Sequence, residues 1–202
     1  MRVFFQSLKP AFISMAFLTV LLGIVYPLLM YGIGQLFFHQ KANGTLLYSK
    51  DGEVMGSEWI AQAFTKSEYF HPRPSSAGDK GYDAANSSGS NLGPTSQKLA
   101  DALGQRISDY RSVNKLASDV VIPADAVTTS GSGLDPDISI ANALLQASRV
   151  ALARSVGEEE VKKLITEHTN ESSWGIFGDA RVNVLRLNLA LDKLSTTREG
   201  AP

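Results

Sequence analysis

The sequence predicts an α+β fold, in which one N-terminal transmembrane helix is followed by a single mixed helix/strand soluble domain. Three observations lead to this prediction. Residues 10–38 contain no charged side chain, apolar residues recur at helical spacing in three later stretches, and short strand-like stretches lie beside Asp-Gly and Gly-Asp turns. The predicted parts are a cytoplasmic N-terminus at 1–10, a transmembrane helix at 11–38, an extracytoplasmic α+β domain at 39–195 and a frayed tail at 196–202.

The composition is that of an ordinary folded chain with an uneven distribution of apolar residues. Of its 202 residues, 44% are hydrophobic and 19% are charged, and the formal net charge is −1. A duplex-binding surface normally carries a clear surplus of Lys and Arg, so we expect no nucleic-acid partner. The chain has no cysteine, which excludes disulfides, thiolate chemistry and cysteine-based zinc sites.

The uncharged segment is expected to anchor the chain in a membrane. As a helix it would be about 40 Å long, more than the ~30 Å hydrocarbon core requires. A cleaved signal peptide has a shorter apolar core and a small-x-small cleavage site, and a buried core helix rarely runs so long without a charge. Pro27 is expected to kink the helix, and Gly23, Gly32 and Gly34 are candidate points of close approach to partner helices.

Charges beside this segment predict its orientation. Arg2, Lys9 and the α-amino group precede it without an acid, whereas Lys50 after it is followed closely by Asp51 and Glu53. The positive-inside bias therefore places the N-terminus in the cytoplasm and the large domain outside.

The domain is expected to open with a hairpin of strands at 45–49 and 53–55, joined through Asp51-Gly52. A short helix capped by Ser57 would follow through residue 64. Residues 69–95 are rich in Gly, Ser, Pro and Asn and predict an ordered irregular segment.

Three helices and two strands are expected in the remainder. The first helix follows Pro94, the second is capped by Ser139 or Asp135, and the third begins at a capping box at 155–158. Strands are predicted at 120–122 and 181–189. Asn183 and Asn188 interrupt the apolar run of the second stretch and are expected to bond to backbone inside the fold. The apolar stripes of the helices are Leu99, Leu103, Ile107, Tyr110 and Val113; then Ala143, Leu144, Ala147, Val150 and Ala151; then Val161, Leu164 and Ile165.

Polar residues on the second helix have two interpretations. Gln146 and Arg149 share a face, while Arg154 lies about 140° round the helix from Arg149. A solvated polar face explains these three residues as well as a nucleotide contact does. His71 has no second ligand at metal-binding spacing, so we expect no metal site and place this side chain within a stiff proline-flanked loop.

Two stretches rich in Ser and Gly, at 87–93 and 130–133, suggest anion binding or an enzymatic function. Their backbone N–H groups could cradle an anion, although tight turns are the more ordinary use of such glycines. A membrane-anchored periplasmic hydrolase using Ser132 or Ser90 is the main alternative function, but no base or carboxylate pair is recognisable beside either serine. A free-standing sensor or adhesin is a third hypothesis, and it predicts a protein that is stable without partner chains.

Four stretches crowded with unusual residues carry a resemblance to a known family. They are Tyr69-Phe-His-Pro-Arg-Pro-Ser75, Ser87-Ser-Gly-Ser-Asn-Leu-Gly93, Ser130-Gly-Ser-Gly-Leu-Asp-Pro136 and Val182-Asn-Val-Leu-Arg-Leu-Asn-Leu-Ala-Leu-Asp192. In this order after one N-terminal span, the chain resembles the C subunit of the bacterial Kdp potassium-transporting P-type ATPase, over roughly residues 8–194. Asp137 departs from the pattern, because many relatives carry His or Asn there.

The resemblance implies a single-pass subunit of a bacterial inner-membrane complex that imports potassium at the expense of ATP. Its implied partners are a channel-like potassium-translocating subunit, a P-type ATPase subunit and a small membrane peptide. The family's C subunit is described as a catalytic chaperone, with no chemistry of its own, that raises the ATP affinity of the pump subunit. We therefore expect no catalytic residue and no cofactor bound by this chain alone, with ATP shared with the pump subunit if it is contacted at all.

The predicted topology and the chaperone role point to different sites. With the domain outside, loop residues would cap the outer mouth of the channel-like subunit, and any effect on ATP would act at a distance. With the domain in the cytoplasm, Gln146, Arg149 and Arg154 could contact nucleotide on the pump subunit. We favour the outward cap because the positive-inside bias places the domain outside, on the opposite face of the membrane from cytoplasmic ATP. The candidate partner-contact residues are His71, Arg73, Ser88, Ser90, Asn91, Ser130, Ser132 and Asp135.

Overall fold

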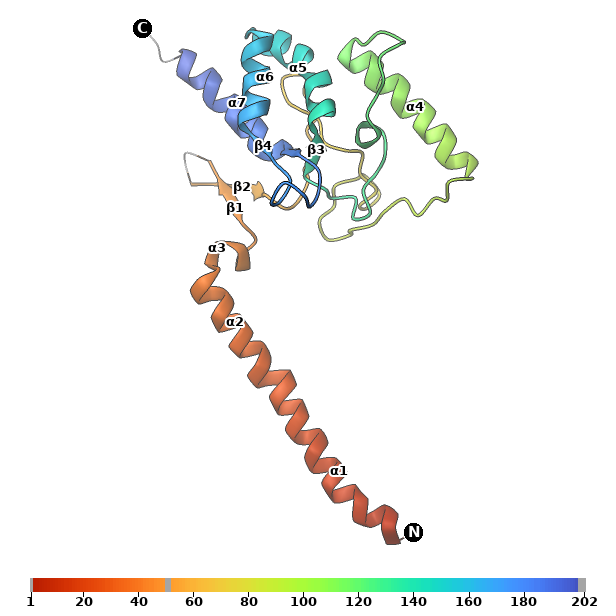
Figure 1. Ribbon diagram of the computed structural model, residues 1–202, viewed down its shortest axis with the longest axis vertical. Coiled ribbons are helices and arrows are strands. Elements are labelled where there is room, and N and C mark those ends of the chain that lie inside the picture. Colours follow the sequence, from red (N-terminus) through yellow and green to blue (C-terminus); the bar gives the residue numbers. More distant parts are fainter. Residues whose placement is uncertain (1, 50–51, 200–202) are drawn as a thin grey trace. The chain divides into compact units, whose positions relative to one another are not determined.

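The structure, a computed structural model, describes residues 2–49 and 52–199, with the backbone alone for residues 2–5 and 195–199. It contains two compact units, Met1–Leu46 and Leu47–Pro202, each described here by itself (Figure 1). Mixed helices and small sheets make up the second unit, which confirms the α+β prediction.

The N-terminal unit is one long helix with a short helical extension. Its parts are α1 (Arg2–Val20), the π-helical turn η1 (Leu21–Val25), α2 (Tyr26–Phe37) and α3 (His39–Ala42). From Gln6 to Phe37 it runs for 32 residues, and its most apolar 18-residue stretch has a mean hydropathy of 2.3, so the helix is long and apolar enough to cross a membrane. None of its most apolar 18-residue stretch is buried, so the alternative of a buried core helix is wrong.

Two small antiparallel sheets form in the second unit. β1 (Leu46–Tyr48) pairs with β2 (Val54–Ser57), which confirms the predicted hairpin, although its turn residue Asp51 lies outside the described residues. The other sheet has the order β3-β5-β4, from β3 (Asp137–Ser139), β5 (Arg181–Asn183) and β4 (Thr169–Asn170). Val182 pairs with Ile138 on one side and with Thr169 on the other.

The helices of this unit are α4 (Gln97–Asn114), the 3₁₀ turn η2 (Ala124–Ala126), α5 (Ile140–Arg154), α6 (Glu158–Glu167) and α7 (Val184–Glu199). In Figure 1, α5, α6 and α7 lie beside the three-stranded sheet. The core forms where they pack, and it includes Phe70, Ile138, Ala143, Ala147, Val150, Val161, Ile165, Val182, Leu187 and Leu191. The predicted stripe of α5 is buried except for Leu144, which is 43% exposed.

The predicted strand at 181–189 is wrong beyond its third residue. Only Arg181–Asn183 is extended, and α7 begins at Val184. Asn183 explains the switch, because its side-chain oxygen accepts a hydrogen bond from the backbone N–H of Arg186 at 3.0 Å, as a helix-capping residue does. Val184, Leu187 and Leu191 then recur at helical spacing on the buried side.

Three further local predictions are wrong: a helix after Ser57, a strand at 120–122, and a capping box at the start of α6. No helix follows Ser57, since Gln62 binds the Met55 carbonyl at 2.8 Å and the Ala61 N–H binds the Leu134 carbonyl at 3.0 Å, which holds this segment open. Residues 120–122 are not a strand, and Val121 is 86% exposed.

The cap of α6 is also different from the prediction. Gly157 occupies the N-cap position without a side-chain bond, while Ser155 ends α5 in the left-handed conformation at φ 53°. Ser139, by contrast, caps α5 as expected by accepting from the Asn142 N–H at 3.1 Å.

Candidate partner-binding site

The segment of residues 66–75 is held in place by amide side chains from two helices. Gln146 of α5 accepts from the His71 N–H at 2.7 Å and donates to the His71 carbonyl at 3.1 Å. Asn188 of α7 does the same for Phe70, at 2.8 and 3.0 Å. Both amides are 1% exposed. Each amide therefore satisfies the N–H and the carbonyl of one residue, as a neighbouring strand would do in a sheet. This explains how an irregular segment is fixed without a sheet.

Two arginines of α5 bind the same segment. Arg149 donates to the carbonyls of Ser67 and Tyr69 at 2.6 and 2.9 Å, and also to the side-chain oxygens of Asn114 and Gln146. Arg154 donates to the Glu68 carbonyl at 2.7 Å and pairs with Asp192 at 2.8 Å.

Burial controls the ionisation of two groups in this network. It lowers the pKa of Arg149 to about 10, and the acceptors of the guanidinium, two carbonyls and two side-chain amides, carry no charge that would oppose the shift. The group stays cationic at neutral pH. Burial and the nearby Arg149 charge lower the pKa of His71 below its ordinary value, so the imidazole is neutral and binds the Lys66 carbonyl at 3.0 Å.

The predicted solvated face on α5 is therefore wrong. Gln146 is 1% exposed and Arg149 is 8% exposed, and both side chains are occupied by bonds to the chain itself. Their spacing placed them correctly on one face of a helix, but that face points inward onto residues 66–71.

The two Ser/Gly runs lie against each other. The Ser88 N–H and the Ser87 hydroxyl both donate to the Ser132 carbonyl, each at 3.0 Å. A Cβ on Gly133, whose φ is +67°, would lie 2.5 Å from the Ser88 carbonyl oxygen and 2.8 Å from the Ala77 nitrogen. The glycine at 133 therefore allows a close approach of two backbone segments that a side chain would prevent.

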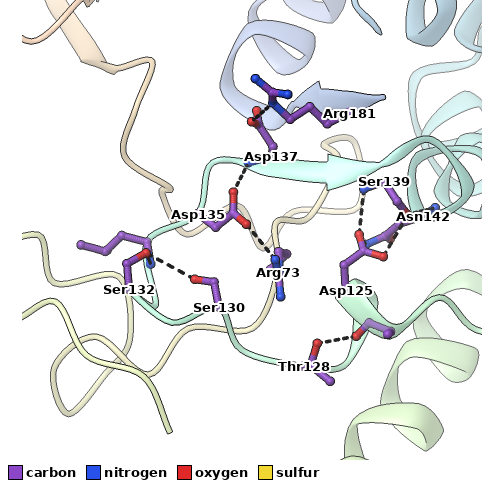
Figure 2. Close-up of polar contacts among 12 residues, drawn as sticks. Arg73, Asp125, Thr128, Ser130, Ser132, Asp135, Asp137, Ser139, Asn142 and Arg181 are labelled. Carbon is purple, nitrogen blue, oxygen red and sulfur yellow. Dashed lines mark hydrogen bonds and ion pairs between the residues drawn. The ribbon is translucent and has the colours of Figure 1, made fainter. Parts of the chain in front are cut away.

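A chain of charged groups joins these loops to the three-stranded sheet (Figure 2). Arg73 pairs with Asp135 at 2.7 Å, Asp135 accepts from the Asp137 N–H at 3.1 Å, and Asp137 pairs with Arg181 at 2.8 Å. These groups line a recess of about 500 Å³. Burial raises the pKa of Asp137, while Arg181 opposes the shift. Asp137 therefore holds a structural ion pair at the position that departs from the family pattern.

Asp125 supports the start of α5 from the other side of the recess. Its carboxylate accepts from the Ser139 N–H, the Ser139 hydroxyl and the Asn142 side chain, at 2.8 to 2.9 Å (Figure 2). Asn142 in turn accepts from the Tyr110 hydroxyl at 2.8 Å and links to Gln146. Burial raises the pKa of Tyr110 well above its usual range.

The candidate partner-contact residues gather on three neighbouring loops. We call residues 71–75, 87–91 and 130–135 the motif surface. Ser88, Ser90, Asn91 and Ser132 are exposed. His71, Arg73, Ser130 and Asp135 are half-buried. The motif surface is polar and carries one ion pair, and its backbone is fixed from within.

Two residues that support this surface were missed in the sequence. Asn142 and Asp125 were not among the candidates, although Asn142 is a polar residue within the apolar pattern of α5, the signal of a buried hydrogen-bonding group. The expectation that Asn183 and Asn188 bond to backbone is confirmed, because Asn183 donates to the Glu58 carbonyl at 2.8 Å and Asn188 binds Phe70.

The serine geometry offers no support for a hydrolase. The Ser132 hydroxyl accepts from the Leu134 N–H at 3.1 Å and lies 3.4 Å from the Ser130 hydroxyl. Within residues 6–49 and 52–194, neither Ser132 nor Ser90 is bonded to a histidine or carboxylate. In the same part of the chain, no three His, Asp or Glu side chains gather as metal ligands would.

The candidate packing residues of the N-terminal helix lie at its π-helical turn and beyond. A Cβ added at Gly23 or Gly32 would meet nothing within 4 Å, and one at Gly34 would lie 3.7 Å from the Ala42 Cβ. The Tyr26 N–H donates to the Leu21 carbonyl. Pro27 has no N–H, so the Gly23 carbonyl lacks its α-helical donor.

Comparison with known proteins gives one consistent result. Residues 8–193 match the family described as KdpC, the K+-transporting ATPase c chain. The potassium-transporting ATPase KdpC subunit of Mycobacterium tuberculosis is 57% identical over 189 residues, which cover 94% of this chain and 99% of that protein. Its counterparts in Caulobacter vibrioides and Beijerinckia indica are 54% and 51% identical, and each match covers 93% of both chains.

Proposed function

This chain belongs to the KdpC family of K+-transporting ATPase subunits, and on that premise we propose that it is a non-catalytic accessory subunit that docks onto the complex through its motif surface. The observation that carries the proposal is the gathering of three motif loops, far apart in the chain, on one polar surface. Gln146, Asn188 and Arg149 hold residues 67–71, where that surface begins, and leave the outer side chains of the three loops available.

The proposed partner for the motif surface is the channel-like potassium-translocating subunit, at its outer mouth. The uncharged helix would cross the bacterial inner membrane once, with Arg2 and Lys9 retained on the cytoplasmic side. The domain would then lie outside, where a rigid polar cap can stabilise the assembled complex. The P-type ATPase subunit and the small membrane peptide would complete that assembly.

An effect on ATP use would be indirect in this arrangement. Both atoms of the Gln146 amide are bonded to His71, and the oxygen also accepts from Arg149 at 2.7 Å. A nucleotide contact would have to break these bonds within a buried network. We therefore propose that this chain binds no ATP by itself and raises the ATP affinity of the pump subunit, as described for the family, through coupling across the complex.

The N-terminal helix would contribute its own contact within the membrane. The Gly23 carbonyl lacks its α-helical donor because Pro27 has no N–H. Since glycine has no side chain and nothing lies within 4 Å of where its Cβ would be, a neighbouring helix can approach this carbonyl closely. A partner helix carrying a hydroxyl or amide at that depth would supply the missing donor. Gly32 and Gly34 would allow close approach further along the helix.

The Arg73–Asp135 ion pair provides the experiment. Replacing Arg73 by Ala should lower the potassium-stimulated ATP hydrolysis of the assembled complex several-fold, because the motif surface loses a charge that a partner can bind. The matched control is the exchange of charges, R73D with D135R. An ion pair that only holds the fold is restored by the exchange, whereas a partner contact stays impaired. Normal activity of R73A in a normally assembled complex would refute the role of this surface.

A further inference from the structure

An exposed apolar loop lies beside the motif surface and is not explained by the fold. Trp174 is 90% exposed, Ile176 is 79% exposed and Phe177 is 62% exposed. Three large apolar side chains within four residues form a contiguous patch, and soluble surfaces seldom keep such a patch without a binding role. We refer to residues 172–178 as the aromatic loop.

The aromatic loop has a defined conformation. Ser173 and Phe177 exchange two backbone hydrogen bonds at 2.8 and 3.0 Å, and the Gly175 N–H donates to the Ser172 carbonyl at 3.0 Å. Trp174 has a left-handed backbone with φ +56°, which is uncommon for a residue with a bulky side chain. The rings of Trp174 and Phe177 pack edge to face at 6.2 Å. The turn therefore presents preorganised rings to the outside.

The loop leads directly into the recess of the motif surface. Asp179, Ala180 and Arg181 follow it in the chain and line the recess of about 500 Å³ together with Arg73 and Asp135. A partner seated on the motif surface would therefore meet the aromatic loop as well. Buried aromatic anchors beside a polar area are the usual composition of an interface centre and its rim.

The charges beside the loop distinguish a protein from a lipid surface. Glu171 precedes it and Asp179 follows it, and both are exposed and outside the ion pairs formed among residues 6–49 and 52–194. An anionic leaflet would repel these two carboxylates from the surface that Trp174 would have to enter. A protein recess with a basic rim would attract them.

We propose that the aromatic loop inserts Trp174, Ile176 and Phe177 into an apolar recess, rimmed by Lys or Arg, on a membrane subunit of the same ATPase complex. This inference rests on the proposed function and names the second half of the same docking surface. The apolar anchors provide affinity, and the two carboxylates steer the approach.

A fluorescent label on the loop tests this directly. Ile176→Cys provides a single thiol in the cysteine-free full-length chain, which is labelled with an environment-sensitive dye and reconstituted into vesicles of phosphatidylcholine and phosphatidylglycerol. A blue shift that requires addition of the remaining subunits of the complex supports the proposal. A shift with vesicles alone identifies a lipid contact and overturns it, and so does the absence of a shift in a complex that has assembled.

Truncation of the anchors gives the energetic test. The double variant W174A/F177A should weaken association of the chain with the C-subunit-depleted complex at least 10-fold. The matched control is Leu152→Ala, because Leu152 is 69% exposed on α5, away from the recess, and should leave association unchanged. If both variants associate equally well, the aromatic loop is not an anchor. That result would not refute docking through the motif surface, which R73A tests separately. An unaltered chain that fails to join the complex overturns both proposals.

Discussion

Replacing Gln146 by Leu should destabilise the domain because it removes the two hydrogen bonds that hold the backbone of His71. We call such a pair of bonds from one side-chain amide to one residue a clamp. The substitution keeps the side-chain volume but leaves the His71 N–H, the His71 carbonyl and one nitrogen of Arg149 without their partners. Each unsatisfied buried group costs about 1–3 kcal/mol. Since His71 is half-buried and can regain some hydration, we expect a loss of roughly 3–6 kcal/mol in the free energy of unfolding.

Urea unfolding of the full-length chain in detergent measures this loss. The matched control is Gln105→Leu on α4, because Gln105 is an exposed helical glutamine that binds only Asp109, at 2.8 Å; it should change stability by less than about 0.5 kcal/mol. Asn188→Leu should resemble Q146L, since it removes the equivalent clamp on Phe70.

The same variant distinguishes the clamp from a nucleotide contact. In complexes that still contain the chain, Q146L should reduce maximal ATP hydrolysis. It should raise the KM for ATP no more than N188L does, which removes the neighbouring bonds to Phe70. A destabilisation below about 1 kcal/mol together with a raised KM for ATP specific to Q146L would refute the reasoning, because it would show that the amide binds nucleotide and not His71.

Three further predictions follow from the loops, the helices and the buried tyrosines. Gly133→Ala should cost at least ~2 kcal/mol in urea unfolding, because its φ is +67° and its Cβ would lie 2.5 Å from the Ser88 carbonyl oxygen. Gly104→Ala, in α4 with open space around the added Cβ, should instead increase the free energy of unfolding by up to about 1 kcal/mol and so raise the melting temperature; a lower melting temperature would contradict this. Burial raises the pKa of Tyr82 from 10.0 to about 12, so the unfolded chain loses this phenol proton first and stability should fall as pH rises from 10 to 12. Tyr82→Phe should flatten that part of the stability profile, and an equally steep profile in the variant would exclude Tyr82 as its cause.

Local patterns predicted the elements that depend on local physics. The 29-residue uncharged stretch, the apolar stripe of α5 and the Ser139 cap each act within a few turns of one helix, and the structure contains all three. The order of the motifs also led to the family that the comparisons show.

The failures occurred where contacts distant in the chain decide the local structure. Arg181 to Leu189 alternates like a strand, but the helix begins at Val184 because Asn183 caps it and α5 and α6 provide a helical face to cover. The direction in which the Gln146 side chain points depends on residues 66–71, which lie 75 positions away in the case of His71. Periodicity places a residue on a face, but it does not say whether that face meets water or another segment.

The buried polar network also explains why the site residues were only partly predictable. Asn142 binds the Tyr110 and Asp125 side chains, and Asp125 binds Ser139, so no spacing rule connects these positions. Asn188 was expected to bond to backbone, but its partner Phe70 lies 118 positions away and could not be predicted. Ser88 and Arg73 were found because their loops carry the family resemblance, whereas the packing of Ser88 against Gly133 and the pairing of Arg73 with Asp135 required the fold.

Thiol labelling in intact cells tests the central claim, an outward domain that docks through the motif surface. Single cysteines are placed at Gln105, on the exposed side of α4, and at Ser87, on the motif surface, and both are probed with a membrane-impermeant maleimide. If the domain lies outside, Gln105→Cys is labelled in every case, whereas Ser87→Cys is labelled when the chain is expressed alone and is protected when the other subunits are present. Labelling of Gln105→Cys only after the cells are opened would place the domain in the cytoplasm and refute an outward cap.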